Sequence, residues 1–134
     1  MRGTVLAAGV ADGVALRLDE PLSLWGGVDP GSGEIIDARH PQRGTSLNGR
    51  VLVMAAVRGS SSSSSVLAEM VRAGCAPAAI VLGEADLILA VGAAVAEELY
   101  AIRVPIVQLP AAELATIPDG AAVSVDEGGE VSLH

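Results

Sequence analysis

One stretch in the middle of the chain constrains the fold more than any other. Residues 51–57 form an unbroken apolar run, which is typical of a strand covered on both faces of a sheet. Residues 60–65 are six consecutive serines. Four apolar residues after them fall at helical spacing: Val66, Leu67, Met70 and Val71. Gly74 provides the stop signal of that helix, so the stretch predicts a strand–loop–helix unit with the serines in the loop.

The serine run has two opposite interpretations. Composition alone favours a flexible linker, because low-complexity serine segments commonly have that role. Position favours an ordered loop, because a flexible segment rarely interrupts a core strand and the helix that follows it. We therefore expect an ordered turn in which Ser64 or Ser65 caps the helix, and capping alone remains an alternative account of one or two serines.

The rest of the chain predicts a β-rich first third followed by further strand–helix units. Apolar, β-branched runs predict strands over residues 4–10, 14–18, 22–25, 34–36, 78–82 and 104–107. The first two are expected to form a hairpin through Ala11-Asp12-Gly13. A helix over 90–100 with Glu97 and Glu98 outward, a helical turn over 111–115 and a final hairpin over 121–125 and 130–133 complete the pattern. These elements predict one α/β domain over residues 1–134.

Composition limits the possible partners. The net charge is −8, and no cluster of basic or aromatic side chains is present to bind nucleic acid. Hydrophobic residues make up 51% of the chain and charged residues 18%, which predicts apolar surface for a partner subunit, or else a core rich in Ala and Val. The single cysteine, Cys75, fits a reducing compartment as a small apolar filler. No signal peptide or membrane span is expected, so a cytoplasmic protein is predicted.

The serine loop has the chemistry of an anion site. The first amides of a helix lack intrahelical partners and carry partial positive charge, and Arg58 adds a full charge beside them. Such a loop suits a carboxylate, a phosphate or a serine oxygen that loses its proton. A P-loop is excluded because its lysine is absent, and the G-x-S-x-G motif of lipase-type hydrolases is absent too.

Five motifs follow one another along the chain: Ser23-Leu24-Trp25-Gly26-Gly27-Val28-Asp29-Pro30, Gly33-Glu34-Ile35-Ile36-Asp37, His40-Pro41, Gly49-Arg50-Val51-Leu52-Val53 and Arg58-Gly59-Ser60-Ser61. Together they resemble the aconitase X swivel domain family. The resemblance implies a swivelling β/β/α fold and, for a chain of this length, a separate small subunit of a dehydratase. It implies elimination of water from a small hydroxy acid such as cis-3-hydroxy-L-proline or mevalonate 5-phosphate. It also implies a large catalytic subunit as partner, which carries the iron–sulfur cluster, so that no metal or cofactor is expected on this chain.

The resemblance also assigns candidate site residues. Ser60 corresponds to the serine that acts as the base in aconitase-like enzymes, while Ser62 stands where aconitase has an arginine. The residues expected to contact the substrate are Arg58, Gly59, Ser61, Ser62 and Ser63. A second possible site loop holds Trp25, Gly26, Gly27, Asp29 and His40. Ordinary alternatives are a core position for Trp25, a turn at Asp29 and a surface loop around His40.

Two other functions stay open at this stage. A stand-alone swivel domain would bind a small anion or regulate a partner without catalysis. An isomerase of the aconitase type would combine dehydration with rehydration. The two-subunit interpretation makes a specific prediction, which is that the isolated chain has no activity.

Overall fold

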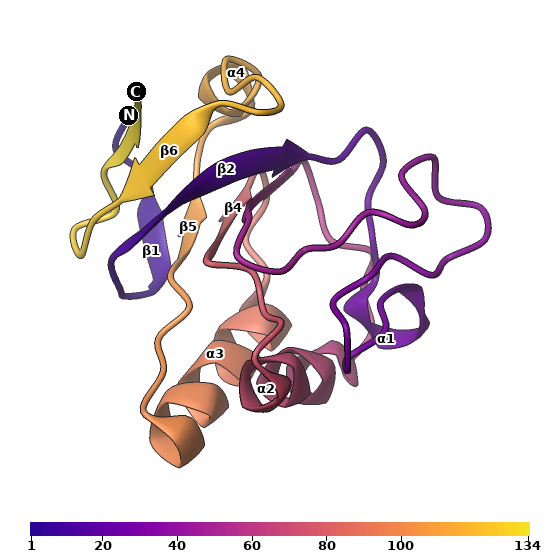
Figure 1. Ribbon diagram of the computed structural model, residues 1–134. Coiled ribbons are helices and arrows are strands. Elements are labelled where there is room, and N and C mark those ends of the chain that lie inside the picture. The colour runs from indigo at the N-terminus through magenta and orange to yellow at the C-terminus, as the bar shows by residue number, and fades with distance from the viewer.

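A seven-stranded sheet organises the computed structural model, which describes residues 1–134 (Figure 1). The strands are β1 (Thr4–Ala7), β2 (Ala11–Arg17), β3 (Val51–Met54), β4 (Ala79–Leu82), β5 (Ile106–Gln108), β6 (Ala122–Val125) and β7 (Val131–Leu133). The helices are α1 (Leu24–Gly27), α2 (Ser63–Ala73), α3 (Leu87–Tyr100) and α4 (Ala111–Leu114). None of these helices is long and apolar enough to cross a membrane.

The sheet has a parallel centre and antiparallel flanks. The strand order is β1-β5-β4-β3-β2-β6-β7, with parallel pairing from β2 through β3 and β4 to β5. The sheet then curls until its two edges meet. The segment before β1 bonds to the β6–β7 hairpin, through Gly3 N to Gly129 O at 2.9 Å and Val131 N to Met1 O at 2.6 Å. Both termini accordingly lie side by side in Figure 1.

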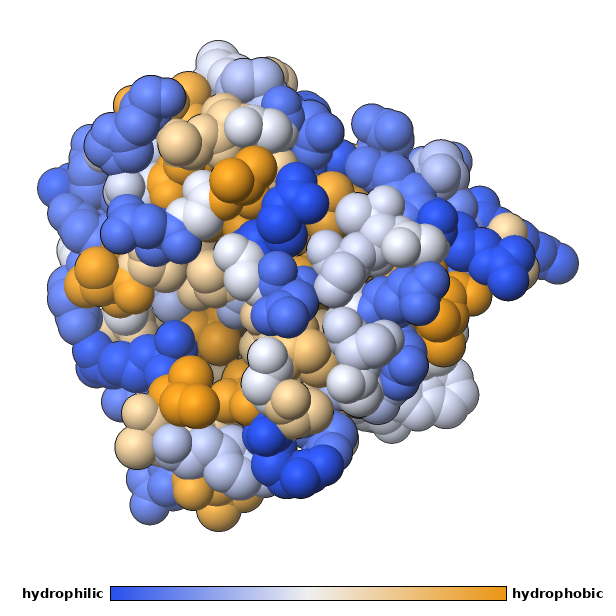
Figure 2. All heavy atoms as spheres, in the orientation of Figure 1, coloured by the Kyte–Doolittle hydropathy of each residue, from blue (hydrophilic) through white to orange (hydrophobic).

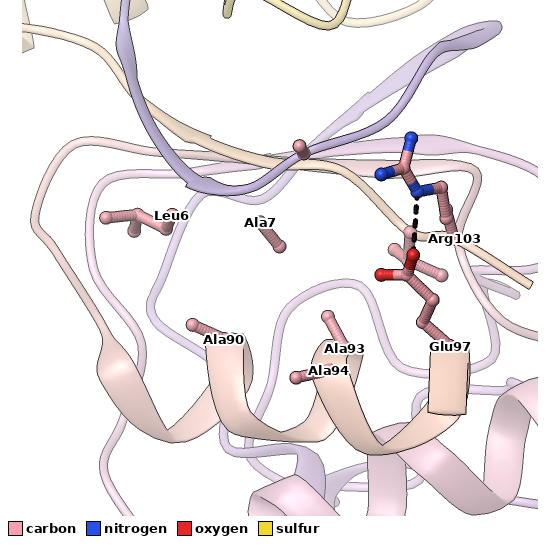
Figure 3. A pocket seen from close by; sticks show the side chains of 9 residues that line it. Leu6, Ala7, Ala90, Ala93, Ala94, Glu97 and Arg103 are labelled. Carbon is pink, nitrogen blue, oxygen red and sulfur yellow. Dashed lines mark hydrogen bonds and ion pairs between the residues drawn. The ribbon is translucent and has the colours of Figure 1, made fainter. Parts of the chain in front are cut away.

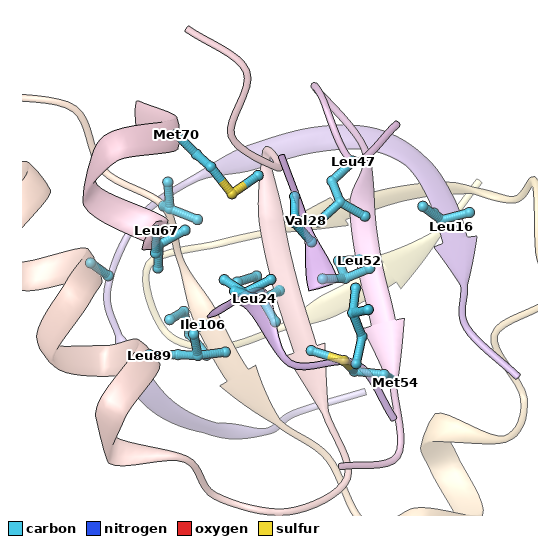
Figure 4. Close-up of a cluster of buried hydrophobic side chains, with 14 of the residues drawn as sticks. Leu16, Leu24, Val28, Leu47, Leu52, Met54, Leu67, Met70, Leu89 and Ile106 are labelled. Carbon is cyan, nitrogen blue, oxygen red and sulfur yellow. The ribbon is translucent and has the colours of Figure 1, made fainter. Parts of the chain in front are cut away.

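Side-chain size separates the two faces of the central strands. The face toward α2 and α3 carries large residues. Leu52, Met54, Leu67 and Leu89 belong to this core (Figure 4), as do Ile80 and Leu82. The inner face of the curled sheet carries small ones: Ala15, Val51, Val53, Ala79 and Val81. Large side chains fill the layer between sheet and helices, whereas small ones fit the interior of a tightly curved sheet. This alternation confirms the expectation that β3 is covered on both faces.

The two long helices lie together on one face of the sheet (Figure 1). α2 ends at Gly74, whose φ of 79° is the left-handed conformation that favours glycine, so the expected stop is confirmed. α3 begins three residues earlier than expected, because the Asp86 carboxylate accepts a bond from Leu89 N at 2.9 Å and caps it. The helices touch closely where Gly92 meets Ser64, since a Cβ added at Gly92 would lie 2.7 Å from Ser64 O.

Three local expectations are wrong. β1 and β2 do not form a hairpin: β1 pairs with β5, and Ala11-Asp12-Gly13 lies inside β2, paired with β6. Gly13 lets β2 lie close to the backbone at Gly49, because a Cβ at position 13 would lie 2.9 Å from Gly49 O. Residues 22–25 are not a strand but a single bridge at Leu22 followed by α1, and residues 34–36 form only isolated bridges.

The start of α2 also differs from expectation. Ser62, not Ser64 or Ser65, is the N-cap, and it makes no side-chain capping bond. The turn starts early because Ser63 N donates to Ser60 O at 3.0 Å. Ser64 and Ser65 therefore belong to the first turn of the helix.

Surplus apolar surface is concentrated on α3. Its outward stripe comprises Leu87, Val91, Val95 and Leu99, all exposed, and Ile102 continues it after the helix. Figure 2 shows apolar residues interspersed with polar ones on the face in view, including the lower part where α2 and α3 lie. The apolar surface expected from composition is therefore present.

Candidate active site

The serine loop lies at the carboxyl edge of the parallel strands. It leaves β3 and enters α2, and α3 starts from the same edge after β4. Ligand sites of open α/β sheets commonly gather at this edge. The loop is fixed to the chain after β2, because Val57 forms a parallel bridge with Leu22 and Arg58 N donates to Leu22 O at 3.2 Å.

The backbone of the loop presents unpaired donors. The amides of Ser61, Ser64 and Ser65 make no hydrogen bond within the chain. They lie at the N-terminus of α2, where the helix dipole places partial positive charge. The hydroxyls of Ser61, Ser62 and Ser65 are exposed. This combination is suited to an anion.

Two of the six serines accept an amide hydrogen bond on their hydroxyl oxygen. Ser60 Oγ accepts from Ser62 N, and Ser63 Oγ accepts from Trp25 N, both at 3.4 Å. Ser63 is 1% exposed, so its hydroxyl is closed to a ligand, whereas Ser60 is half-buried. Ser60 is therefore the one serine of the run whose oxygen both accepts an amide bond and remains open to solvent.

Arg58 is exposed, and its guanidinium has no acceptor within the chain. Arg39 and Arg43 are likewise unpaired, while the other arginines bond to carboxylates or backbone carbonyls. One short segment, residues 20–22, holds both regions. Glu20 O bonds to the His40 ring in the loop of Arg39 and Arg43, and Leu22 O accepts from Arg58 N. Arg58 is thus an unpaired cation next to the serine loop in a chain of net charge −8.

The Trp25 turn is held directly against the serine helix. Trp25 N donates to the buried Ser63 Oγ, and Trp25 O accepts from Ser23 Oγ at 3.1 Å. Gly26 follows with a left-handed φ of 77°, which favours glycine and distorts the short helix α1 from within. The indole is 59% exposed, so Trp25 does not fill the core. Trp25 and Ser63 are 38 positions apart, so no local pattern predicts their contact. The bond from Ser23 lies within the turn itself, and a serine at the start of a turn is the signal that could have predicted it.

Asp29 lies far from the serines. Its carboxylate accepts from Gly31 N and Ser32 Oγ, both at 3.0 Å, which is ordinary turn chemistry. The neighbouring Pro30 O accepts from Cys75 Sγ at 3.2 Å, beyond the C-terminal end of α2. The 11 residues of α2 span roughly 16 Å, so the structure does not bring Asp29 to the serine loop.

His40 is buried and structural in its contacts. Its Nε2 lies 3.0 Å from Glu20 O, and its Nδ1 accepts from Gln42 N at 3.1 Å. These partners correspond to a neutral ring that donates through Nε2. Both nitrogens are occupied in holding the loop, so no ring atom is directed at the serines.

The cavities of the molecule lie elsewhere. One of about 100 Å³ lies between β1 and α3, lined by Ala7, Ala90 and Ala94 and flanked by the Arg103–Glu97 ion pair of 3.0 Å (Figure 3). Another of about 210 Å³ lies near Gly74 and Ile102. Neither includes a residue of the serine loop, and both are smaller than the roughly 300–1,000 Å³ of typical ligand pockets. The loop therefore lies on an open surface.

The fold and the loop together define an α/β domain that presents hydroxyls, amides and a free arginine at the carboxyl edge of its sheet. Comparison with known proteins agrees with this description. The family described as "Aconitase X swivel domain" matches residues 1–133. The crystal structure of Thermococcus kodakaraensis aconitase X in its holo form superposes with a TM-score of 0.88 at 34% identity, covering 99% of this chain and 96% of that chain.

Curated relatives fall into two size classes. The phosphomevalonate dehydratase small subunit of Methanothermobacter thermautotrophicus is 39% identical, over 91% of this chain and 89% of its own length. The cis-3-hydroxy-L-proline dehydratase of Pseudomonas aeruginosa is 54% identical over 75% of this chain, which spans only 17% of that enzyme's length. The chain belongs to the aconitase X swivel domain family, which confirms both the resemblance and the expected fold class.

Proposed function

We propose that this chain is the small subunit of an aconitase X-type dehydratase and supplies the base that removes a proton from a small hydroxy acid. The observation that carries the proposal is the open serine loop, in which Ser60 Oγ accepts an amide bond beside unpaired donors and a free Arg58. The names of the relatives support dehydration as the reaction class.

Ser60 is the proposed base. A serine oxygen is a weak base unless its anionic form is stabilised. The bond from Ser62 N and the N-terminus of α2 supply stabilisation of that kind. In the proposed step the deprotonated Ser60 Oγ takes a proton from carbon and becomes a neutral hydroxyl. The C–H electron pair becomes the second bond of a C=C, and hydroxide leaves the neighbouring carbon and takes up a proton from solvent to form water.

The other donors of the loop hold the acid group. The exposed hydroxyls of Ser61 and Ser62 and the Arg58 guanidinium are proposed to bind the substrate carboxylate or phosphate, with Gly59 allowing close approach because no atom lies within 4 Å of a Cβ added there. Ser63 has a different role, since its buried hydroxyl positions the Trp25 turn. The names of the relatives support both cis-3-hydroxy-L-proline and mevalonate 5-phosphate as candidate substrates.

The residues of this chain do not fit an iron–sulfur cluster. Such clusters are held by several thiolates, and Cys75 is buried and donates to Pro30 O instead. No group of three or more His, Cys, Asp or Glu side chains is placed to hold a metal ion. In this proposal the cluster belongs to the large subunit.

The test is replacement of Ser60 in the assembled enzyme. This chain is co-expressed with the large subunit encoded by the same source, and elimination of water from both candidate substrates is measured. We expect Ser60→Ala to lower kcat by about 10²–10⁴-fold, the usual contribution of a positioned base, while the subunits still co-purify.

Ser132→Ala in β7 serves as the matched control, because that residue lies outside the serine loop. Retained turnover in Ser60→Ala would reject Ser60 as the base. A loss in Ser65→Ala as large as in Ser60→Ala would move the assignment to another hydroxyl of the run.

A further inference from the structure

Trp25 is the only tryptophan of the chain, and the structure exposes it beside the serine loop. The backbone of Trp25 is held on both sides, because its N–H donates to Ser63 Oγ and its C=O accepts from Ser23 Oγ. The indole nevertheless remains 59% exposed. A rigid backbone thus presents the largest apolar side chain of the molecule to solvent.

The surroundings of Trp25 leave room for another molecule. A Cβ added at the adjacent Gly26 would meet no atom within 4 Å. Exposed tryptophans on rigid backbones are enriched among the residues that dominate protein interfaces. A small hydroxy acid has little apolar surface with which to cover an indole, whereas a protein surface can cover it fully.

We propose that Trp25 is an anchor for the large subunit at the rim of the serine loop, and that Ser63 is its positioning residue. This inference rests on the proposed function, because it takes the large subunit as the occupant. The contact joins subunit docking to the site, since Ser63 belongs to the first turn of the helix whose N-terminus carries the serine loop.

The test uses 5-fluorotryptophan incorporated into this chain alone, which gives a single ¹⁹F resonance from position 25. On addition of the unlabelled large subunit we expect the resonance to shift and to lose its dependence on H₂O versus D₂O, because the indole becomes buried. Trp25→Ala should weaken assembly by at least about thirtyfold, the loss typical of an interface hot spot. Circular dichroism checks that the variant is folded.

A matched pair of serine variants tests the positioning role. In the free chain, Ser63→Ala should shift or broaden the ¹⁹F resonance because Trp25 N loses its acceptor. Ser65→Ala removes an exposed hydroxyl without a hydrogen bond and should leave the resonance unchanged. An equal effect of the two variants would overturn the role of Ser63.

The outcomes separate this inference from the proposed function. An active complex in which the ¹⁹F resonance keeps its solvent dependence would overturn the anchor and leave the dehydratase proposal standing. An indole that becomes buried in an inactive complex would support the anchor and count against the dehydratase. Absence of any complex would overturn both.

Discussion

The six serines of the loop have identical side chains, but their hydrogen bonds place the hydroxyls in different chemical environments. Ser63 is buried and bonds to the Trp25 turn, Ser64 Oγ donates to Ser61 O at 3.1 Å, and Ser60 Oγ accepts from Ser62 N. A hydroxyl that accepts an amide bond is better able to carry negative charge than one bonded only to water. The distinction between base and support within the run therefore rests on contacts, not on residue type.

Cys75 gives a residue-scale prediction about pH. Burial, with the Asp29 carboxylate as a further cause, raises the pKa of the thiol above its ordinary 9.0. The folded state thus retains a proton that the unfolded chain releases, so the stability from this group is present below pH 9.0 and is lost as pH rises through the raised pKa. We expect the free energy of unfolding to fall more steeply above about pH 9 in the wild type than in Cys75→Ala.

Urea unfolding at a series of pH values measures this difference. The window is favourable because the chain has no lysine and only one tyrosine. Cys75 should also react slowly with iodoacetamide until the protein unfolds. Parallel pH profiles in the two proteins would contradict the expected linkage.

At the scale of elements, the contact between α2 and α3 holds the serine helix in place. Gly92 allows the approach, because an added Cβ would lie 2.7 Å from Ser64 O and 3.0 Å from Ser64 Cα. Both are backbone atoms, so neither can rotate away. Any side chain at position 92 must push α3 from the first turn of α2.

Gly92→Ala is therefore expected to destabilise the protein by about 1–3 kcal/mol, the usual cost of overpacking. Inside an unobstructed helix the same substitution would raise stability by about 1 kcal/mol, so the sign of the change is diagnostic. The urea midpoint measures it. A higher midpoint in Gly92→Ala would show that the two helices separate without cost.

Local sequence signals predicted the elements better than their partners. The apolar run of β3, the spacing in α2, the stop at Gly74 and the β6–β7 hairpin depend on neighbouring residues, and each is present. The position of β1 next to β5 joins residues about a hundred positions apart, as in the pairing of Thr4 with Gln108. No local pattern determines such a pairing, so a hairpin was expected instead.

In the candidate site too, local features could be predicted from the sequence and contacts between distant segments could not. The ordered serine loop follows from its position between a buried strand and a helix, and its match to a family motif assigned Ser60. The contact of Ser63 with Trp25, the exposure of the indole and the distance of Asp29 from the loop follow from how a separate segment packs along α2. Contacts between segments of this kind have no signature in either segment alone.

At the scale of the whole molecule, apolar side chains fill the space inside the curled sheet. These side chains are buried, and both cavities lie away from the serine loop. The anion-binding groups are instead collected on an open edge. A surface of this kind cannot exclude water from a reacting carbon, so the proposed chemistry requires a second protein surface over the loop.

This requirement gives the prediction for the whole molecule. The isolated chain should turn over neither cis-3-hydroxy-L-proline nor mevalonate 5-phosphate, whereas its complex with the large subunit should dehydrate one of them. Product formation by NMR, followed for the chain alone, the large subunit alone and the mixture, measures this directly. The Ser60→Ala complex is the control, since it assembles the same surfaces without the proposed base. Turnover by the isolated chain would contradict the two-subunit proposal, and binding of an anion without turnover in the complex would favour a regulatory domain.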